Sequence, residues 1–135
     1  MSCVFKSMNN PISSILIDSN STMYALTRDA LYKSINKGIN WEFVRMGIAP
    51  ESLLFAALNS SKANNILVAV KNIGIMKSED AGINWKVCKI DGLKGREIKI
   101  IRANSKVCFA CSDNTLFTSM DGGDNWSVVD SIKKI

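Results

Sequence analysis

Three segments of the chain repeat one pattern, Ser-x-Asp/Asn-x-Gly-x-x-Trp, and this repeat constrains the fold more than any other feature. The copies run from Ser34 to Trp41, from Ser78 to Trp85 and from Ser119 to Trp126. Their serines are 44 and 41 residues apart. Repeats of roughly 40 to 50 residues are typical of four-stranded β units that stack on one another. A chain of 135 residues therefore has room for three such units.

The repeated pattern is typical of a tight turn between two strands. Its glycine would supply the positive φ of such a turn, and its serine and Asp or Asn can accept hydrogen bonds from nearby backbone amides. Its tryptophan would pack a large apolar ring under the turn. We call these segments the box turns and predict a structural role for Ser34, Asn36, Gly38, Trp41, Ser78, Asp80, Gly82, Trp85, Ser119, Asp121, Gly123 and Trp126.

Apolar runs bounded by Asn, Asp, Gly and Ser surround each box turn and predict four strands per unit. The expected ranges are 14–18, 23–27, 30–34 and 41–45, then 53–58, 66–70, 74–78 and 85–89, then 98–103, 107–111, 115–119 and 126–129. Counting back from each serine without a gap aligns Tyr24 with Val68 and Phe109. The same count aligns Leu26 with Val70 and Cys111. Apolar residues on both faces of the second strand predict units that pack face to face.

With these motifs the chain resembles the Asp-box (BNR-repeat) β-propeller family, which includes sialidases, sortilin-type receptor domains and photosystem II assembly factors. The resemblance implies an all-β propeller unit over 1–135, with three four-stranded blades at about 12–46, 52–90 and 97–130. Asn36 and Lys37 depart from the family's usual Asp and small or polar residue. Residues 3–9 match one further strand, but Asn10-Pro11 replaces the glycine and no tryptophan follows. We interpret 3–9 as an orphan strand.

Sialidase chemistry, which the resemblance suggests, needs an arginine cluster, a tyrosine paired with a glutamate, and an acidic aspartate. The chain has four arginines and two tyrosines, and it lacks the Arg-Ile-Pro motif of those enzymes. Tyr24 and Tyr32 align with apolar residues and are expected in the core. We therefore predict a protein that is not an enzyme and uses no cofactor.

The cysteines include a Cys108-x-x-Cys111 pair, which could indicate redox chemistry or half a zinc site. In this chain, which has no histidine, both align with aliphatic residues of the other repeats, and so does Cys88. Residues three apart on a strand point to opposite faces, so the pair could not share a metal ion. We predict core cysteines, no metal site and a fold that tolerates Cys111→Val.

The net charge of +5 is compatible with an acidic partner, but the lysines are scattered rather than clustered. We therefore do not expect nucleic-acid binding. No stretch is apolar for the roughly 18 residues of a membrane span, and the N-terminus has no secretory apolar core. These features predict a cytoplasmic protein without a membrane span.

A binding site is expected on the rim opposite the box turns, where loops on a rigid scaffold gather. The candidate ligand-binding residues there are Arg28, Asp29, Asn72, Asp113, Asn114, Lys94 and Arg96. The alternative is that they are ordinary polar turn formers. We predict a non-catalytic interaction or scaffold module that binds a protein or peptide. The alternative function is a glycan-binding or degenerate glycosidase module.

Three blades would leave two apolar faces open, whereas propellers close with four to eight blades. Either the polypeptide is a piece of a longer propeller, or identical chains complete a ring. We favour a homo-oligomer, a dimer with about six blades. Within each blade the tryptophan should matter most, and Trp85→Ala should cost roughly 3 to 5 kcal/mol of unfolding free energy.

Overall fold

The computed structural model describes residues 11–27, 30–47, 58–62, 64–71, 73–91, 97–104 and 107–129. These ranges contain thirteen strands and no helix. The strands are β1 (Ile12–Ile17), β2 (Met23–Thr27), β3 (Leu31–Ser34), β4 (Glu42–Val44), β5 (Leu58–Lys62), β6 (Asn65–Val70), β7 (Gly74–Ser78), β8 (Lys86–Val87), β9 (Lys89–Ile90), β10 (Ile100–Ala103), β11 (Cys108–Cys111), β12 (Leu116–Ser119) and β13 (Asn125–Val128). In this part of the chain no helix is long and apolar enough to cross a membrane.

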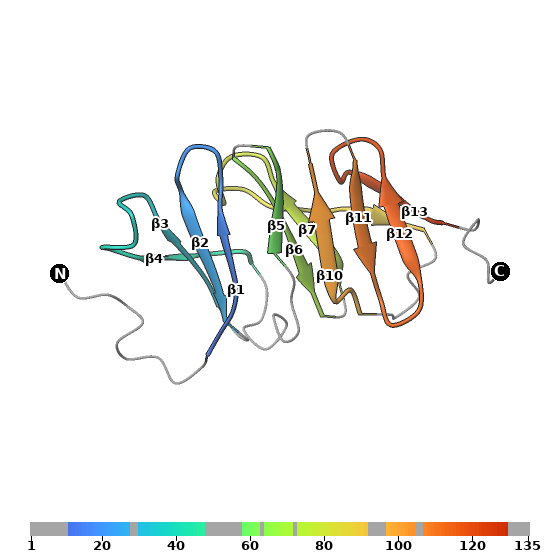
Figure 1. Ribbon diagram of the computed structural model, residues 1–135, viewed down its shortest axis with the longest axis horizontal. Coiled ribbons are helices and arrows are strands. Elements are labelled where there is room, and N and C mark those ends of the chain that lie inside the picture. Colours follow the sequence, from blue (N-terminus) through green and yellow to red (C-terminus); the bar gives the residue numbers. More distant parts are fainter. Residues whose placement is uncertain are drawn as a thin grey trace.

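The strands form three sheets, with orders β1-β2-β3-β4, β5-β6-β7-β8 and β10-β11-β12-β13-β9. Consecutive strands from β1 to β4, β5 to β8 and β10 to β13 pair antiparallel. The sheets stand side by side, with β1 next to β5 and β5 next to β10 (Figure 1). They are the three predicted blades of an all-β fold, and we call them the first, second and third blade.

The strand registers define which positions of the three blades are equivalent. The residue paired with the box serine is Met23 in the first blade, Ile66 in the second and Cys108 in the third. The next residue along is therefore equivalent in all three blades: Tyr24, Leu67 and Phe109. By the same count Leu26, Ala69 and Cys111 are equivalent.

The gap-free alignment of the second blade was therefore wrong by one residue, because it paired Val68 and Val70 with these positions. The cause is the β6–β7 turn, where five residues separate the pair Ala69 and Ile75. Four residues separate the equivalent pair in β2 and β3. Gly74, with a φ of 118°, accommodates the additional residue.

The box turns have the predicted hydrogen bonds. Each serine hydroxyl accepts the N–H of the glycine four residues on, at 2.8 to 2.9 Å, and donates to the oxygen of the Asp or Asn. The indole N–H of each tryptophan donates to the carbonyl of that glycine. The glycines have φ values of 85°, 90° and 97°, so their role as positive-φ residues is confirmed.

The first box turn has one hydrogen bond fewer than the others. Asp80 and Asp121 each accept a second bond at Oδ2, from the side-chain amide of the asparagine four residues on. Asn36 accepts from the Asn40 backbone at Oδ1, but its Nδ2 cannot accept a bond. The Asn40 side-chain oxygen is also buried without a partner. The departure of this copy from the repeat therefore has a structural consequence.

The hydrophobic core lies between the blades, which confirms face-to-face packing. One cluster joins the first and second blades: Tyr24, Leu26, Leu31, Val44, Met46, Ile66, Val68, Val70 and Met76. The other joins the second and third: Leu67, Ala69, Ile75, Cys88, Ile98, Ile101, Cys108, Ala110, Phe117 and Trp126. Both faces of β6 are buried because each contributes to a different cluster. Trp126 is buried, whereas Trp41 and Trp85 are half-buried.

A lysine on the third strand of each of the first two blades reaches the box turn of the next blade. Lys33 donates through Nζ to the carbonyl of Ala81, at 2.9 Å. Lys77, which is buried, donates to Asp124 at 3.0 Å. A buried ammonium needs such a partner because burial removes its hydration. These contacts fix one blade against the following one.

Two predicted strands differ from the structure. The strand expected at 53–58 is β5 at Leu58–Lys62, and 53–57 lie outside the described residues. The strand expected at 85–89 breaks at Cys88, and β9 then pairs parallel to β13 at the outer edge of the third sheet. The chain changes sheets there because the Asp91 and Lys89 amides bond to carbonyls of the next blade. The predicted orphan strand 3–9 also lies outside the described residues.

Candidate functional site

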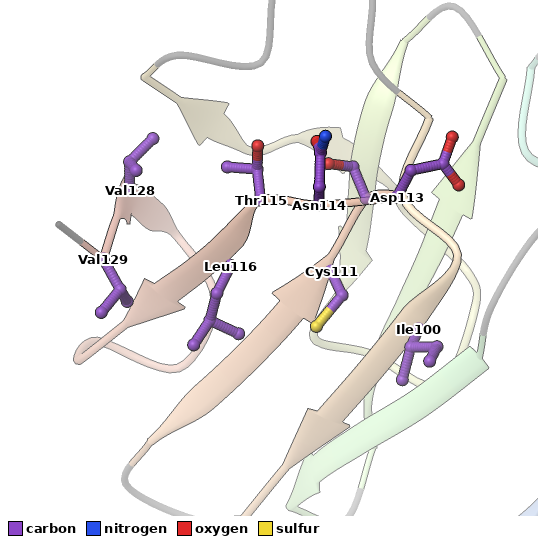
Figure 2. Close-up of a pocket in the computed structure, with 9 residues that line it drawn as sticks. Ile100, Cys111, Asp113, Asn114, Thr115, Leu116, Val128 and Val129 are labelled. Atoms are coloured by element: carbon purple, nitrogen blue, oxygen red, sulfur yellow. The ribbon is translucent and has the colours of Figure 1, made fainter. Parts of the chain in front are cut away.

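A cleft of about 470 Å³ opens on the face of the third blade that points away from the second (Figure 2). Four strands and one turn build it. Ile100 of β10, Cys111 of β11, Leu116 of β12 and Val128 of β13 line the cleft, together with the flanking residue Val129. The β11–β12 turn supplies Ser112, Asp113, Asn114 and Thr115. One side of the cleft is therefore apolar and the other is polar.

Three residues of the apolar wall, Cys111, Leu116 and Val129, and Phe109 on the same face of the sheet occupy positions that are buried in the other two blades. Phe109, Cys111, Leu116 and Val129 are equivalent to Tyr24, Leu26, Leu31 and Val44, and to Leu67, Ala69, Ile75 and Cys88. All eight of those equivalents are at most 6% exposed. Phe109, in contrast, is 43% exposed, and the other three are only half-buried. The wall is a blade interface without its second blade.

The polar side is the β11–β12 turn. The N–H of Ser112 donates to the carbonyl of Thr115 at 3.0 Å and closes the turn around Asp113 and Asn114. Asp and Asn favour such positions because their side chains tolerate turn conformations. The Ser112 hydroxyl is buried and has no hydrogen-bond partner.

The charge at the mouth of the cleft is balanced. Lys99 bonds to Asp113 at 2.7 Å between Nζ and Oδ1, and both side chains are largely exposed. This hydrogen bond raises the pKa of Lys99. An exposed pair of this kind contributes little stability, but it orients the carboxylate at the edge of the turn.

The structure describes two of the seven predicted ligand-binding residues. Asp113 and Asn114 lie together in the cleft, on the rim opposite the β12–β13 box turn (Figures 1 and 2). The other five lie outside the described residues: Arg28, Asp29, Asn72, Lys94 and Arg96. Their role in binding stays a prediction.

Sequence analysis predicted open apolar faces on the outer blades, but it placed the binding residues on the rim and did not assign the apolar wall of the cleft to the site. Cys111, Leu116 and Val129 have the pattern of core residues, and by pattern alone they are indistinguishable from their buried equivalents. The signal that could have found them is the expectation of open apolar faces, because each blade needs a neighbouring blade to cover its face.

Tyr24, Cys88 and Cys108 lie in the core as predicted, whereas the prediction was wrong for Cys111 and Tyr32, which are half-buried and belong to neither core cluster. Cys88 and Cys108 are buried and Cys111 is half-buried; all three are free thiols. Burial raises the pKa of the Cys88 thiol to about 12. Burial, with a smaller effect of Asp18, likewise raises the pKa of Tyr24 to about 12. Among the described residues no three His, Cys, Asp or Glu side chains are grouped as metal ligands.

The predicted opposite orientation of Cys108 and Cys111 is confirmed. Cys108 belongs to the cluster between the second and third blades, whereas Cys111 lines the cleft on the other face. The tyrosines differ in burial: Tyr24 is fully buried, and Tyr32 is half-buried with its ring edge against Phe43 at 6.1 Å.

No protein-family model and no curated protein matches the chain significantly. Solved structures of similar fold were found. An ancestral GH74 enzyme matches with a TM-score of 0.71 and 15% identity, over 94% of this chain and 19% of its own. YCF48 bound to D1 peptide has a TM-score of 0.67 and 15% identity, over 90% of this chain and 41% of its own. YCF48 from Cyanidioschyzon merolae has a TM-score of 0.65 and 18% identity, over 93% and 45%.

The chain thus spans less than half the length of each of these structures. At such low identities the similarity establishes the fold and not the activity. The similar structures are β-propeller proteins, and each sheet of the chain has the four antiparallel strands of a blade. The chain therefore has the β-propeller fold.

Proposed function

We propose that the chain is a non-catalytic protein-interaction module of the Asp-box type, and that the cleft face of the third blade is its binding surface. One observation carries the proposal. Cys111, Leu116 and Val129, whose equivalents are buried in the other two blades, are only half-buried in the third, where they form part of the wall of a cleft. An exposed apolar surface with a polar border is typical of a protein-binding site.

The composition of the cleft favours a protein or peptide ligand. Leu116 and Val129 offer apolar contacts, and Asn114 and Thr115 of the β11–β12 turn offer polar groups at the border. The similarity to YCF48, which has been solved with a D1 peptide bound, supports a peptide as one class of ligand. The hydrogen bonds of the box turns support the Asp-box assignment, which also rests on the sequence motif.

The proposal that the module is non-catalytic rests on the chemistry of the same cleft. Glycoside hydrolysis generally needs two carboxyl groups on either side of the scissile bond. Among the described lining residues Asp113 is the only carboxylate, and it is paired with Lys99. Binding needs no such second group.

A glycan-binding module is the second candidate, and one observation favours it. Phe109 is 43% exposed on the cleft face, and Arg102 is its cross-strand partner. An exposed ring beside a polar side chain can serve as a platform for a sugar. A comparison of peptide and sugar binding therefore separates the candidates.

The test is to pan the purified protein against a displayed random-peptide library and to apply it to a glycan array. Leu116→Glu places a charge on the apolar wall, and Met120→Glu in the neighbouring box turn is the control because Met120 is exposed outside the cleft. We expect selected peptides to lose at least tenfold in affinity for the first variant and to bind the second normally. Equal peptide binding by both variants contradicts the proposed site. Sugar binding tighter than about a millimolar favours the second candidate.

A further inference from the structure

We infer that the occupant of the cleft face is a second copy of this chain, whose first blade packs on the third blade of its partner. The inference rests on the proposed function, because it names the partner of the same binding surface. Its basis is the comparison of the two open faces with the two blade interfaces that the molecule already contains.

The first blade has an open face complementary to that of the third. Ile15 of β1 is equivalent to Ile101 of β10, since each pairs with the same position of the neighbouring strand. Ile101 is fully buried against the second blade, whereas Ile15 is 60% exposed. Ile17 and Phe43 of the first blade are also exposed. This blade therefore presents apolar residues at positions that cover a preceding blade, and among the described residues no blade packs on them.

The existing interfaces show what would fill the cleft. The wall residues of the first blade are covered by Val68, Val70 and Met76 of the second, and those of the second are covered by Ala110 and Phe117 of the third. The cleft is thus the acceptor half of an interface that occurs twice within the chain. In the first blade the equivalent donor positions are only partly uncovered: Ala25 and Thr27 are buried and Tyr32 is half-buried. The exposed residues of this face are Ile15, Ile17 and Phe43.

The charged contacts between blades support this pairing. Lys33 and Lys77 reach the box turn of the following blade, and a Cβ added at Gly122 of the third turn would lie 3.4 Å from Nζ of Lys77. The side chain at this turn position therefore points toward the lysine of the preceding blade. In the first box turn the same position is Lys37.

The third blade has no lysine at the position that would contact Lys37 of a docked first blade. Its residue equivalent to Lys33 and Lys77 is Thr118, which is neutral and bonds to the carbonyl of Cys108. A third lysine here would face Lys37 of a docked first blade and repel it. Threonine at 118 and lysine at 37 are therefore compatible with a third blade that packs against the first blade of another copy.

The number of copies follows from the blade count. Propellers close with four to eight blades, and two copies of the three described blades give six. In the ring, the third blade of each copy would contact the first blade of the other. The two junctions are then identical, and the ring closes. The cleft, now covered along its apolar wall, would lie at the junction of the two copies.

The first experiment measures the mass of the purified full chain by light scattering at micromolar concentration. We expect a dimer, and monomers for both Ile15→Glu and Leu116→Glu, because each variant places a charge in both junctions of the ring. A mixture of the two variants should form heterodimers. In a heterodimer one junction joins the unchanged third blade of the Ile15→Glu chain to the unchanged first blade of the Leu116→Glu chain. Failure of the mixture to associate overturns the head-to-tail arrangement, as does a monomeric natural chain.

The second experiment uses a substitution that the fold already accepts. Thr118→Lys introduces the residue that occupies the same position in the other two blades, so folding should be preserved. We expect the dimer dissociation constant to rise about tenfold, which corresponds to about 1.4 kcal/mol, and Lys37→Asp in the same chain to restore it. An unchanged dissociation constant for Thr118→Lys overturns the pairing of these blades.

The outcomes separate this inference from the proposed function. A monomer whose selected peptides still depend on Leu116 overturns the second-copy inference and leaves the peptide-binding site intact. A dimer in which Leu116→Glu disrupts association supports the inference even when the library yields no peptide.

Discussion

Three glycines at positive φ allow a quantitative test of how closely the blades are packed. Gly47, Gly82 and Gly123 have φ values of 74°, 90° and 97°, so alanine is strained at each. The space around them differs. An added Cβ would meet nothing within 4 Å at Gly47, Val44 Cγ1 at 3.2 Å from Gly82, and Leu67 Cδ2 at 2.8 Å from Gly123. Both contacted residues belong to the preceding blade.

The magnitudes follow from these distances. Alanine at positive φ costs about 1 kcal/mol of unfolding free energy, and this term is common to the three variants. A contact of 2.8 Å requires a shift of Leu67, which is fully buried in the core between the blades. Overpacking of this kind costs roughly 1 to 3 kcal/mol. We expect losses of about 1 kcal/mol for Gly47→Ala, about 1 to 2 for Gly82→Ala and about 2 to 4 for Gly123→Ala.

The assay is urea unfolding followed by tryptophan fluorescence and far-ultraviolet circular dichroism. For a domain of this size 1 kcal/mol corresponds to a shift in Tm of about 3 to 5 °C. Thermal unfolding should therefore rank the three alanine variants in the same order of stability. Gly47→Ala is the internal control for the backbone term. A loss for Gly123→Ala within about 0.5 kcal/mol of the control would show that Leu67 relaxes freely and would refute the tight interface.

Three further predictions concern the box turns and a cysteine. Trp126→Ala should destabilise the fold by about 3 to 5 kcal/mol, and Trp85→Ala by less, because only Trp126 is almost fully buried; urea unfolding of both variants tests this order. Hydrogen bonds, mainly from asparagine, lower the pKa values of Asp80 and Asp121 to about 2. The two ionised carboxylates therefore stabilise the fold fully above about pH 4, and this stabilisation should fade as the pH falls toward 2. This loss should be smaller for the Asp→Asn variants in an acid titration followed by circular dichroism. Cys111→Val should change stability by less than about 0.5 kcal/mol, and a larger loss of Tm would contradict its assignment as a half-buried apolar residue.

The sequence alone was enough for the fold class, the number of blades and the local structure of the box turns. Its motif places serine, glycine and tryptophan at fixed distances along one short segment, and the hydrogen bonds among these motif residues are all made within that segment. Local geometry of this kind depends on residues that are neighbours in the chain. For the same reason the missing bond at Asn36 could be anticipated as a weakness of the first turn.

The alignment of strands was less accessible to sequence reasoning. A one-residue difference in the β6–β7 turn moves Leu67 rather than Val68 into the position of Tyr24. Since side chains alternate between the faces of a strand, this shift exchanges the two faces of β6. Both faces are apolar, so the sequence pattern contains no sign of the shift.

What the sequence determined is each blade by itself, because turns and strands arise from residues close together in the chain. Only the tertiary structure decided which faces the neighbouring blades cover. Leu31, Ile75 and Leu116 occupy one equivalent position, yet the first two are fully buried and the third lines a cleft. Burial depends on what packs against a residue, and that partner lies in the next repeat rather than in the residue's own strand.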